Sequence, residues 1–528
     1  MKRYGKILAV LIIAAAVCLF FANKKSGYHI DEIYSFGLAN SYYAPYITDI
    51  KDGDIVDKVF TRQELIDYLT VGDDDAFAFG SVYYNQTQDV HPPLFYWLLN
   101  FVSSVCRNVG FSKWPALIMN LVIYIGTLFL LYKLASELFD DETAALAAVI
   151  IYALSAVGIS TFLLIRMYAL LAFWTVLLAL LILRHLKSEK NRYYPLIFLT
   201  VFAGMMTQYY FVFYAFFVCL AYDIYLLISK KYKSLLLFSL SAVCGVAAMV
   251  ISFPACIDHI FTGNGQVVSG SNALENLSNI SSWLSKFSGY MDIYLKLRIF
   301  VRLFILLLFC AVTILIIRKE KLKENIALKP IQFIIIIPAF LAAILVFIVS
   351  PVIEQRYVYN ILPIIILSIC PLFIIVFRCL KKFPKYNIIV PAVLTALILV
   401  SAFELKVNTP DYLFKEENDY SEITDKYTSL PCVYFDDNYF APITADITQL
   451  LKFDEFLVVN DSNSEKLKDY LSSSDEYITF IDNSWYWSGG VYYELVRWRF
   501  EEDTGYSESE PVYEHGLSIT YTFAKPDN

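Results

Sequence analysis

Apolar runs long enough to cross a lipid bilayer recur between residues 6 and 403 of this 528-residue chain, and they leave it few possible folds. Most runs hold roughly 18 to 21 residues, which as a helix crosses a hydrocarbon core of about 30 Å. Backbone groups find no water in that core, so each run is expected to be an α-helix. The eleven predicted spans are residues 6–22, 115–132, 143–165, 167–185, 195–207, 209–229, 234–254, 297–317, 331–350, 357–377 and 386–403.

Beyond residue 403 the composition changes, because charged and polar residues return and no apolar run reaches spanning length. Three short runs rich in β-branched and aromatic residues predict strands, and a helix-like stretch lies between the second and the third. These are residues 432–435, 456–459 and 477–481, with the helix at 464–471. The aromatic cluster 485–490 could stack on sugar rings or could equally pack in the domain core or rest on the membrane.

The predicted architecture is therefore a polytopic all-α membrane domain over residues 1–403, followed by a small α/β domain over residues 404–528. The net charge of −8 comes from particular acidic loops, and the basic patches that bind nucleic acids are absent. Nine cysteines show no metal-ligand spacing. Most lie in apolar segments, where cysteine usually acts as a small hydrophobic residue.

The orientation follows from the rule that basic residues gather on the cytoplasmic side. The short apolar segment 94–106 decides on which side of the membrane every later loop lies, because each crossing reverses the side. If it does not cross and the N-terminus is cytoplasmic, four basic clusters face the cytoplasm. They are residues 184–192, 230–233, 318–323 and 378–385. We therefore predict a multi-pass cell-membrane protein with a cytoplasmic N-terminus and an extracytoplasmic C-terminal domain. Residues 1–22 lack a clear cleavage pattern and are taken as an uncleaved first helix rather than a signal peptide.

This topology places on the outer face the polar segments that interrupt the apolar runs. They are the first loop at about 23–113 and residues 166–168, 208–210, 255–295 and 354–357. A cavity built from these segments is the predicted active site.

Asp31 and Glu32 lie just beyond the first span, near the membrane surface. A carboxylate there can orient or deprotonate a hydroxyl group, and two adjacent carboxylates raise each other's proton affinity. The alternative is a solvated acidic loop, since the same loop holds many more acidic residues. Thr61 and Glu64 have the spacing of a capping box, which predicts short helices within the loop.

The first loop ends with Asp89 and His91, directly before the paired prolines Pro92 and Pro93. The prolines fix the entry into an aromatic helix and hold both polar side chains at the membrane surface. Alternatively this is only a helix start within an aromatic belt.

Arg166 and Arg356 each lie at the outer end of a span, and Tyr168 and Tyr357 follow them closely. A guanidinium group there can bind a phosphate through two parallel hydrogen bonds. The alternative is an arginine that only extends its charge to the interface. Positive charge is disfavoured on the outer side, which adds weight to the phosphate-binding interpretation.

In this order the motifs resemble the GT-C superfamily of membrane glycosyltransferases, in particular family 39 with its protein-mannosyltransferase-like and aminoarabinose-transferase-like bacterial members. The resemblance covers roughly residues 1–400. It is carried by Asp31-Glu32, by His91-Pro92-Pro93-Leu94-Phe95-Tyr96-Trp97, by Arg166-Met167-Tyr168-Ala169-Leu170, by Thr207-Gln208-Tyr209-Tyr210, and by Arg356-Tyr357 with Pro363.

The resemblance implies a reaction in which an acceptor hydroxyl attacks a sugar on a polyprenyl-phosphate carrier, with inversion. It makes Asp31 the general base, supported by Glu32. It assigns Arg166, Arg356 and His91 to the carrier phosphate. The substrate pocket would hold Asp89, Tyr168, Gln208, Tyr209 and Tyr357. Some relatives have a lysine where this chain has His91, and a histidine where it has Gln208.

No cofactor is expected, although Asp31 and Asp89 could share a divalent metal ion. The predicted partners are the lipid-linked sugar donor, membrane lipid and an extracytoplasmic acceptor, which could be a lipid, an envelope polymer or a protein; no nucleic acid is expected. Three other functions stay open: a transporter or flippase, a non-catalytic envelope-binding protein, and a polymerase or ligase of lipid-linked glycans, which would differ only in the acceptor. A transporter would favour ionisable residues in mid-span.

Overall fold

A computed structural model describes residues 5–51, 53–261, 298–318, 329–350, 354–381, 385–436, 440–482, 492–515 and 518–526. The aromatic cluster 485–490 and most of the loop 255–295 lie outside these residues. The chain folds into two compact units. The first unit comprises Met1–Ala22, Asp89–Phe95 and Leu117–Asp411, and the second comprises Asn23–Gln88, Tyr96–Ala116 and Tyr412–Asn528.

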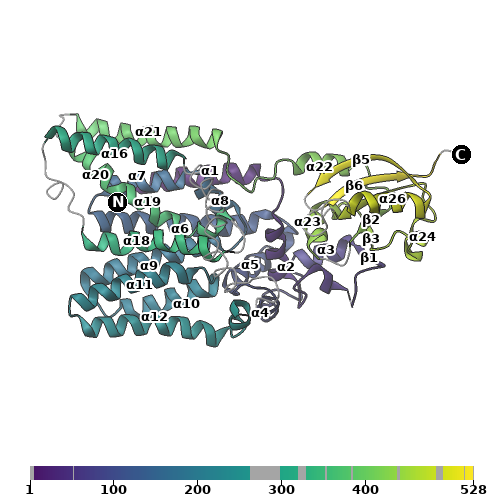
Figure 1. The fold of residues 1–528 in the computed structure, drawn as a ribbon, viewed down its shortest axis with the longest axis horizontal. Coiled ribbons are helices and arrows are strands. Elements are labelled where there is room, and N and C mark those ends of the chain that lie inside the picture. The colour runs from purple at the N-terminus through teal and green to yellow at the C-terminus, as the bar shows by residue number, and fades with distance from the viewer. Residues whose placement is uncertain are drawn as a thin grey trace. The chain divides into compact units, whose positions relative to one another are not determined.

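Apolar helices, most of them long, make up the first unit, and most of them run side by side (Figure 1). They are α1 (Gly5–Lys24), α6 (Lys113–Phe139), α7 (Glu142–Ala153), α8 (Ala156–Leu163), α9 (Tyr168–Ser188), α10 (Tyr193–Thr207), α11 (Phe211–Ile228), α12 (Tyr232–Ser252), α13 (Cys256–Phe261), α16 (Arg298–Arg318), α18 (Pro330–Val349), α19 (Leu362–Ile366), α20 (Cys370–Leu380) and α21 (Tyr386–Val407). Helix α10 packs between α9 and α12, and α11 packs on α12 and α18.

The polytopic membrane fold is confirmed. In the described part of the chain, eight helices are long and apolar enough to cross a bilayer, and the bent pair α7 and α8 could be a ninth span. Helix α10 and the apolar stretch Phe300–Ile314 of α16 are shorter. Each predicted span therefore coincides with a helix or a helix pair, while the count of eleven crossings stays a prediction.

Two local signals explain where helices in this unit break. Asp141 caps α7 by accepting hydrogen bonds from the backbone of Thr143 and Ala144, and Ser155 caps α8 by accepting from Gly158. The restart at Ser155 accompanies a bend of 60° between the two helices. The chain also bends at the polar segment 208–210, because α10 ends at Thr207 and α11 begins at Phe211.

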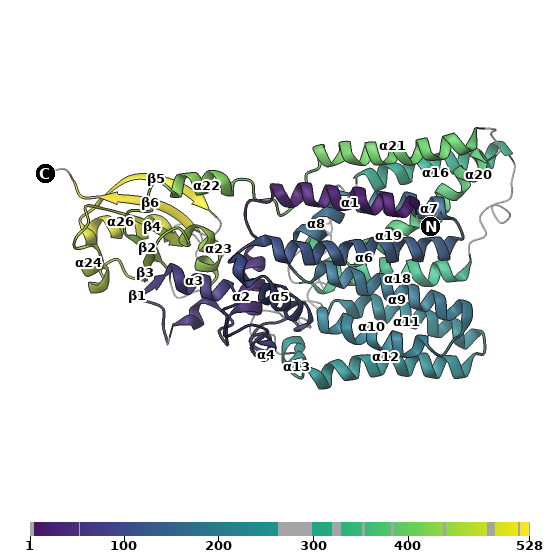
Figure 2. The ribbon, with the colours of Figure 1, turned by 180° about the vertical axis from the view of Figure 1, so that it is seen from behind.

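A six-stranded sheet is the centre of the second unit (Figure 2). Its order is β1 (Lys58–Thr61), β3 (Glu455–Val459), β2 (Cys432–Phe435), β4 (Glu476–Asp482), β6 (Ser518–Ala524) and β5 (Ser507–His515). The central strands β3, β2 and β4 are parallel, and the outer pairings are antiparallel. These three strands are the ones predicted from the sequence, so that prediction is confirmed.

Helices cover both faces of this sheet. The helices of the unit are α2 (Ile30–Asn40), α3 (Arg62–Leu69), α4 (Phe79–Gln88), most of α5 (Leu94–Val105), α22 (Glu417–Thr424), α23 (Phe440–Leu450), α24 (Glu465–Leu471) and α26 (Tyr492–Thr504). On one face, Leu467 of α24 and Phe500 of α26 join the strand residues Phe435 and Leu457 in one buried core. On the other face, Tyr434 packs its ring against Phe480 and donates its hydroxyl proton to Asp446 of α23 at 2.7 Å. Alternate strand residues thus point to opposite helical layers.

Strand β1 comes from the first loop, which the sequence assigns to the membrane domain. It pairs with β3, and the buried Phe60 stacks on Phe456 with ring centroids 5.4 Å apart. Thr61 then caps α3, as the predicted capping box with Glu64 requires. In the structure most of the first loop therefore packs with the C-terminal segment, whose strand β3 pairs with β1.

Candidate active site

Asp89 and His91 form a hydrogen-bonded pair in the first unit, just before α5. The distance from His91 Nδ1 to Asp89 Oδ2 is 2.7 Å, and the two side chains are only 16% and 14% exposed. Burial acts to raise the pKa of Asp89, but the hydrogen bond and charge of His91 and the charge of Arg166 outweigh it and lower that pKa. Asp89 is therefore held as an anion beside two basic side chains.

Arg166 lies in the turn between α8 and α9. Its backbone N–H donates to Leu164 O at 2.8 Å, and the residue is only 5% exposed. Tyr168 begins α9 and packs edge-on against Tyr359, with ring centroids 6.3 Å apart. The turn thus holds a guanidinium group within the unit and near Asp89, which is not the placement of an arginine that only extends into solvent.

The bend between α10 and α11 adds Gln208 and Tyr209 to this group. Gln208 Oε1 accepts from the backbone N–H of Tyr209 at 2.7 Å, which fixes the bend. The Tyr209 hydroxyl bonds to His259 Nδ1 at 2.9 Å, and His259 is almost fully buried. Burial raises the pKa of Tyr209, and the negative charge of Asp89 adds to the effect. Tyr209 is therefore close enough to Asp89 to feel its charge.

Arg356 belongs to a second group, in the 3-10 turn Gln355–Val358. Its guanidinium group lies over the Tyr357 ring, 5.7 Å from the centroid, and Tyr357 packs edge-on against Tyr210 at 5.2 Å. The Tyr210 hydroxyl lies 3.5 Å from Ser350 Oγ, and burial raises the pKa of Tyr210 to about 12. Since Tyr209 and Tyr210 are adjacent, the α10–α11 bend touches both groups.

The predicted site residues of the first unit thus lie in two groups, which the bend between α10 and α11 connects, and their roles in binding or catalysis stay predictions. His259 was not predicted as a site residue. The sequence offered only its position in an outer loop after Pro254 as a signal, and the contact with Tyr209 depends on the folded chain.

The acidic pair Asp31 and Glu32 lies in the second unit, in the first turn of α2. His29 precedes this helix, and its Nδ1 accepts from the backbone N–H of Asp31 at 3.1 Å. The Asp31 carboxylate is 20% exposed, with Oδ2 at 3.6 Å from His29 Nδ1. Asp31 therefore remains within reach of a substrate.

Glu32 is placed differently, because its side chain is fully buried. Its Oε2 accepts from Lys25 Nζ at 2.8 Å and from the backbone N–H of His29 at 2.7 Å. Burial lowers the pKa of Lys25, while the charge of Glu32 opposes that shift. This geometry gives Glu32 the role of holding the start of α2, and it leaves Asp31 as the accessible member of the pair.

A short segment after α21 completes this arrangement. Lys25 Nζ also donates to Tyr412 O at 2.8 Å and lies 5.0 Å from the centroid of the Phe414 ring. The His29 ring contacts the rings of both Tyr412 and Phe414. Both residues adopt the left-handed backbone region, with φ of 66° and 47°. Such strained residues persist only where their surroundings fix them, so this segment is tightly built.

No group of three or more His, Cys, Asp or Glu side chains with metal-binding geometry occurs among the described residues. The absence of a cofactor therefore stays a prediction.

Comparison with known proteins supports the resemblance. A family model described as dolichyl-phosphate-mannose-protein mannosyltransferase matches residues 90–257. No curated protein matches the chain in sequence.

Two solved structures of ArnT from Cupriavidus metallidurans are similar in fold, each at 10% sequence identity. The one bound to undecaprenyl phosphate has a TM-score of 0.52 and covers 98% of both chains, and the one in the apo state has a TM-score of 0.48 and covers 99% of this chain and 98% of its own. The family match and the first likeness confirm the resemblance to the GT-C superfamily, and the helical unit has a GT-C type of fold.

Proposed function

We propose that this protein transfers a sugar from a polyprenyl-phosphate carrier to an acceptor hydroxyl on the extracytoplasmic side of the cell membrane, with inversion. The match to a mannosyltransferase family that uses a lipid-phosphate donor supports the proposal. So does the likeness in fold to ArnT, which was solved with undecaprenyl phosphate.

The grouping of Asp89, His91 and Arg166 carries this proposal. All three fall within or next to the segment that matches the family, and two of them can bind an anion. A guanidinium group binds phosphate oxygens through parallel N–H donors. Asp89 orients the His91 ring through Nδ1, and in the doubly protonated ring Nε2 carries a second N–H that can donate to the same phosphate. Arg356, stacked on Tyr357, is the second candidate cation.

The proposed step breaks one bond and forms one. The acceptor oxygen attacks the anomeric carbon, the bond from that carbon to the phosphate oxygen breaks, and the lipid phosphate leaves with the electron pair. Asp31 takes the proton of the acceptor hydroxyl as general base. The phosphate gains charge during the step, so cations fixed beside it stabilise the transition state. Since these cations are side chains, transfer is proposed to need no metal ion, and a chelator should leave the rate unchanged.

Asp31→Asn tests the proposal. Asparagine has nearly the same shape but cannot accept the proton, so transfer from a synthetic polyprenyl-phosphate sugar by purified protein should fall about 10²- to 10⁴-fold. Asp54→Asn is the matched control, because Asp54 is an exposed acidic residue of the same loop and should leave the rate unchanged. Parent-level transfer by Asp31→Asn would exclude Asp31 as the base. If the parent protein cleaves no carrier at all, a transporter or a binding protein becomes the better interpretation.

A further inference from the structure

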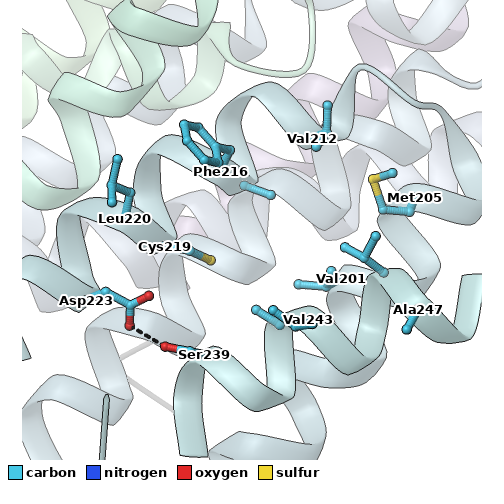
Figure 3. A pocket seen from close by; sticks show the side chains of 13 residues that line it. Val201, Met205, Val212, Phe216, Cys219, Leu220, Asp223, Ser239, Val243 and Ala247 are labelled. Carbon is cyan, nitrogen blue, oxygen red and sulfur yellow. Dashed lines mark hydrogen bonds between the residues drawn. The ribbon is translucent and has the colours of Figure 1, made fainter. Parts of the chain in front are cut away.

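A groove runs along one side of the helices α10, α11 and α12 (Figure 3). Its volume is about 450 Å³, within the range of about 300–1,000 Å³ that is usual for ligand sites. On α11 it is lined by Val212, Phe216, Leu220 and Asp223, which lie on one helical face. These positions span about 16 Å of helix axis, so the groove has the length and direction of one extended hydrocarbon chain.

Asp223 gives the groove a polar end. Its Oδ1 bonds to Ser239 Oγ of α12 at 3.0 Å, and both residues line the groove (Figure 3). The Ser239 hydroxyl also lies 2.9 Å from Leu235 O, and its single proton can serve only one of these acceptors. The proton of the Ser239 hydroxyl is therefore shared between Asp223 Oδ1 and Leu235 O. The other carboxylate oxygen of Asp223, Oδ2, is available on the groove side.

Asp223 lies in the last third of α11, five residues before Ile228. A hydrogen bond between two transmembrane helices stabilises the fold by less than a carboxylate costs inside the bilayer, although that cost falls toward the end of the helix. Ionisable side chains in such helices usually serve a ligand or an ion. The other residues that line the groove supply no basic partner for Asp223.

We propose that the α10–α12 groove binds a single-chain lipid alcohol, whose hydrocarbon chain lies along Val212, Phe216 and Leu220 and whose hydroxyl donates to Asp223. The hydroxyl satisfies the free carboxylate oxygen and needs no counter-charge. A phosphate ester of the same lipid is rejected, because its negative charge would lie beside that of Asp223.

This site is distinct from the proposed donor site. Asp223 follows Tyr209 by 14 positions in sequence, which corresponds to about 20 Å along α11. The groove therefore has its polar end far from the α10–α11 bend, and the inference does not depend on the proposed transfer reaction.

The test compares geranylgeraniol with geranylgeranyl monophosphate, both radiolabelled, on the full-length protein in phosphatidylcholine nanodiscs. Only binding that Val243→Phe abolishes is counted, because a phenylalanine at this lining position fills the groove. The parent should bind the alcohol at least about tenfold more tightly, since repulsion between two anions at hydrogen-bond distance exceeds the free energy of a tenfold change.

Asp223→Asn keeps a hydrogen-bond acceptor but removes the charge, so the preference should shrink toward equality. Ser241→Ala is the control, because Ser241 bonds to Leu237 O on the same helix and does not line the groove. Three results would each overturn the proposal: equal binding of both lipids by the parent, an unchanged preference in Asp223→Asn, or no binding that Val243→Phe affects.

Discussion

The buried ion pair between Lys25 and Glu32 can be tested by removing one charge at a time. Both side chains are fully buried, and Lys25 Nζ donates to Glu32 Oε2 and to Tyr412 O. Lys25→Met keeps most of the side-chain volume but leaves the Glu32 carboxylate buried without its cation. Breaking a buried pair in this way typically costs about 3–5 kcal/mol. At about 1.4 kcal/mol per tenfold, the folding equilibrium of the second unit should shift by roughly 10²- to 10³-fold or more.

The double variant Lys25→Met with Glu32→Gln separates charge from packing. Glutamine removes the negative charge and keeps an oxygen that can accept from the His29 N–H, so the cap of α2 survives. The uncompensated charge is then gone, and most of the lost stability should return.

Cys432 provides the assay for this pair. It is fully buried in the central strand β2, so a thiol reagent modifies it only when the second unit opens. Labelling of the full-length protein across a urea series, quantified on the Cys432 peptide, measures that opening. Cys18 is buried in α1 of the first unit and reports general unfolding in the same sample. The reasoning fails if Lys25→Met opens within about 0.5 kcal/mol of the parent, or if the double variant is as unstable as the single one.

Three further outcomes are expected. Arg166→Ala and Arg356→Ala should each weaken carrier use by about 10- to 150-fold, because a lost charge-assisted hydrogen bond costs about 1.5–3 kcal/mol. Unchanged kinetics of both variants in donor titrations would show that neither arginine binds the phosphate. Against the upward effect of burial, His91 and Arg166 lower the pKa of Asp89 below its usual 3.8. The stability that this carboxylate contributes is thus complete above pH 3.8 and is lost as the pH falls through the lower pKa of Asp89 in the folded protein. His91→Ala should move that loss to higher pH in an acid titration of thermal stability. An unmoved titration would contradict the claim that His91 lowers the pKa of Asp89. Phe60→Ala should cost about 3–5 kcal/mol in the Cys432 labelling assay, because it removes a fully buried ring from the β1–β3 contact, and a cost near zero would show that β1 does not hold the sheet.

The sequence predicted those elements whose signals are local. The spans are visible as apolar runs, and β2, β3 and β4 as short β-branched and aromatic runs. Strand β1 could not be predicted, because Lys58–Thr61 is only four residues long and buries a single side chain, Phe60. Its partner β3 lies almost 400 residues later in the chain, so no local sequence pattern predicts the pairing.

The candidate site also has a part that the sequence could predict and a part that it could not. The predicted order of the spans groups Asp89, Arg166 and Tyr209, and the structure brings them together in the first unit. Asp31 and Glu32 look equivalent in sequence, because both are acidic and adjacent. They differ only once α2 forms, since the helix turns Glu32 toward Lys25 and leaves Asp31 accessible.

The pairing of β1 with β3 also has a consequence for how the protein is made. Arg62, which follows β1 directly and begins α3, donates to the backbone oxygen of Lys452, which lies 390 residues later in the chain. At about 5–20 residues per second, a ribosome needs roughly 20–80 seconds to supply that partner. During this interval the strand of the first loop has no neighbour to pair with, and an unpaired strand edge invites aggregation. The first loop of this protein therefore stays unassembled during biosynthesis until β3 has been translated, as far as Val459. A product truncated before β3 is then prone to misfolding even when every helix of the first unit has been inserted.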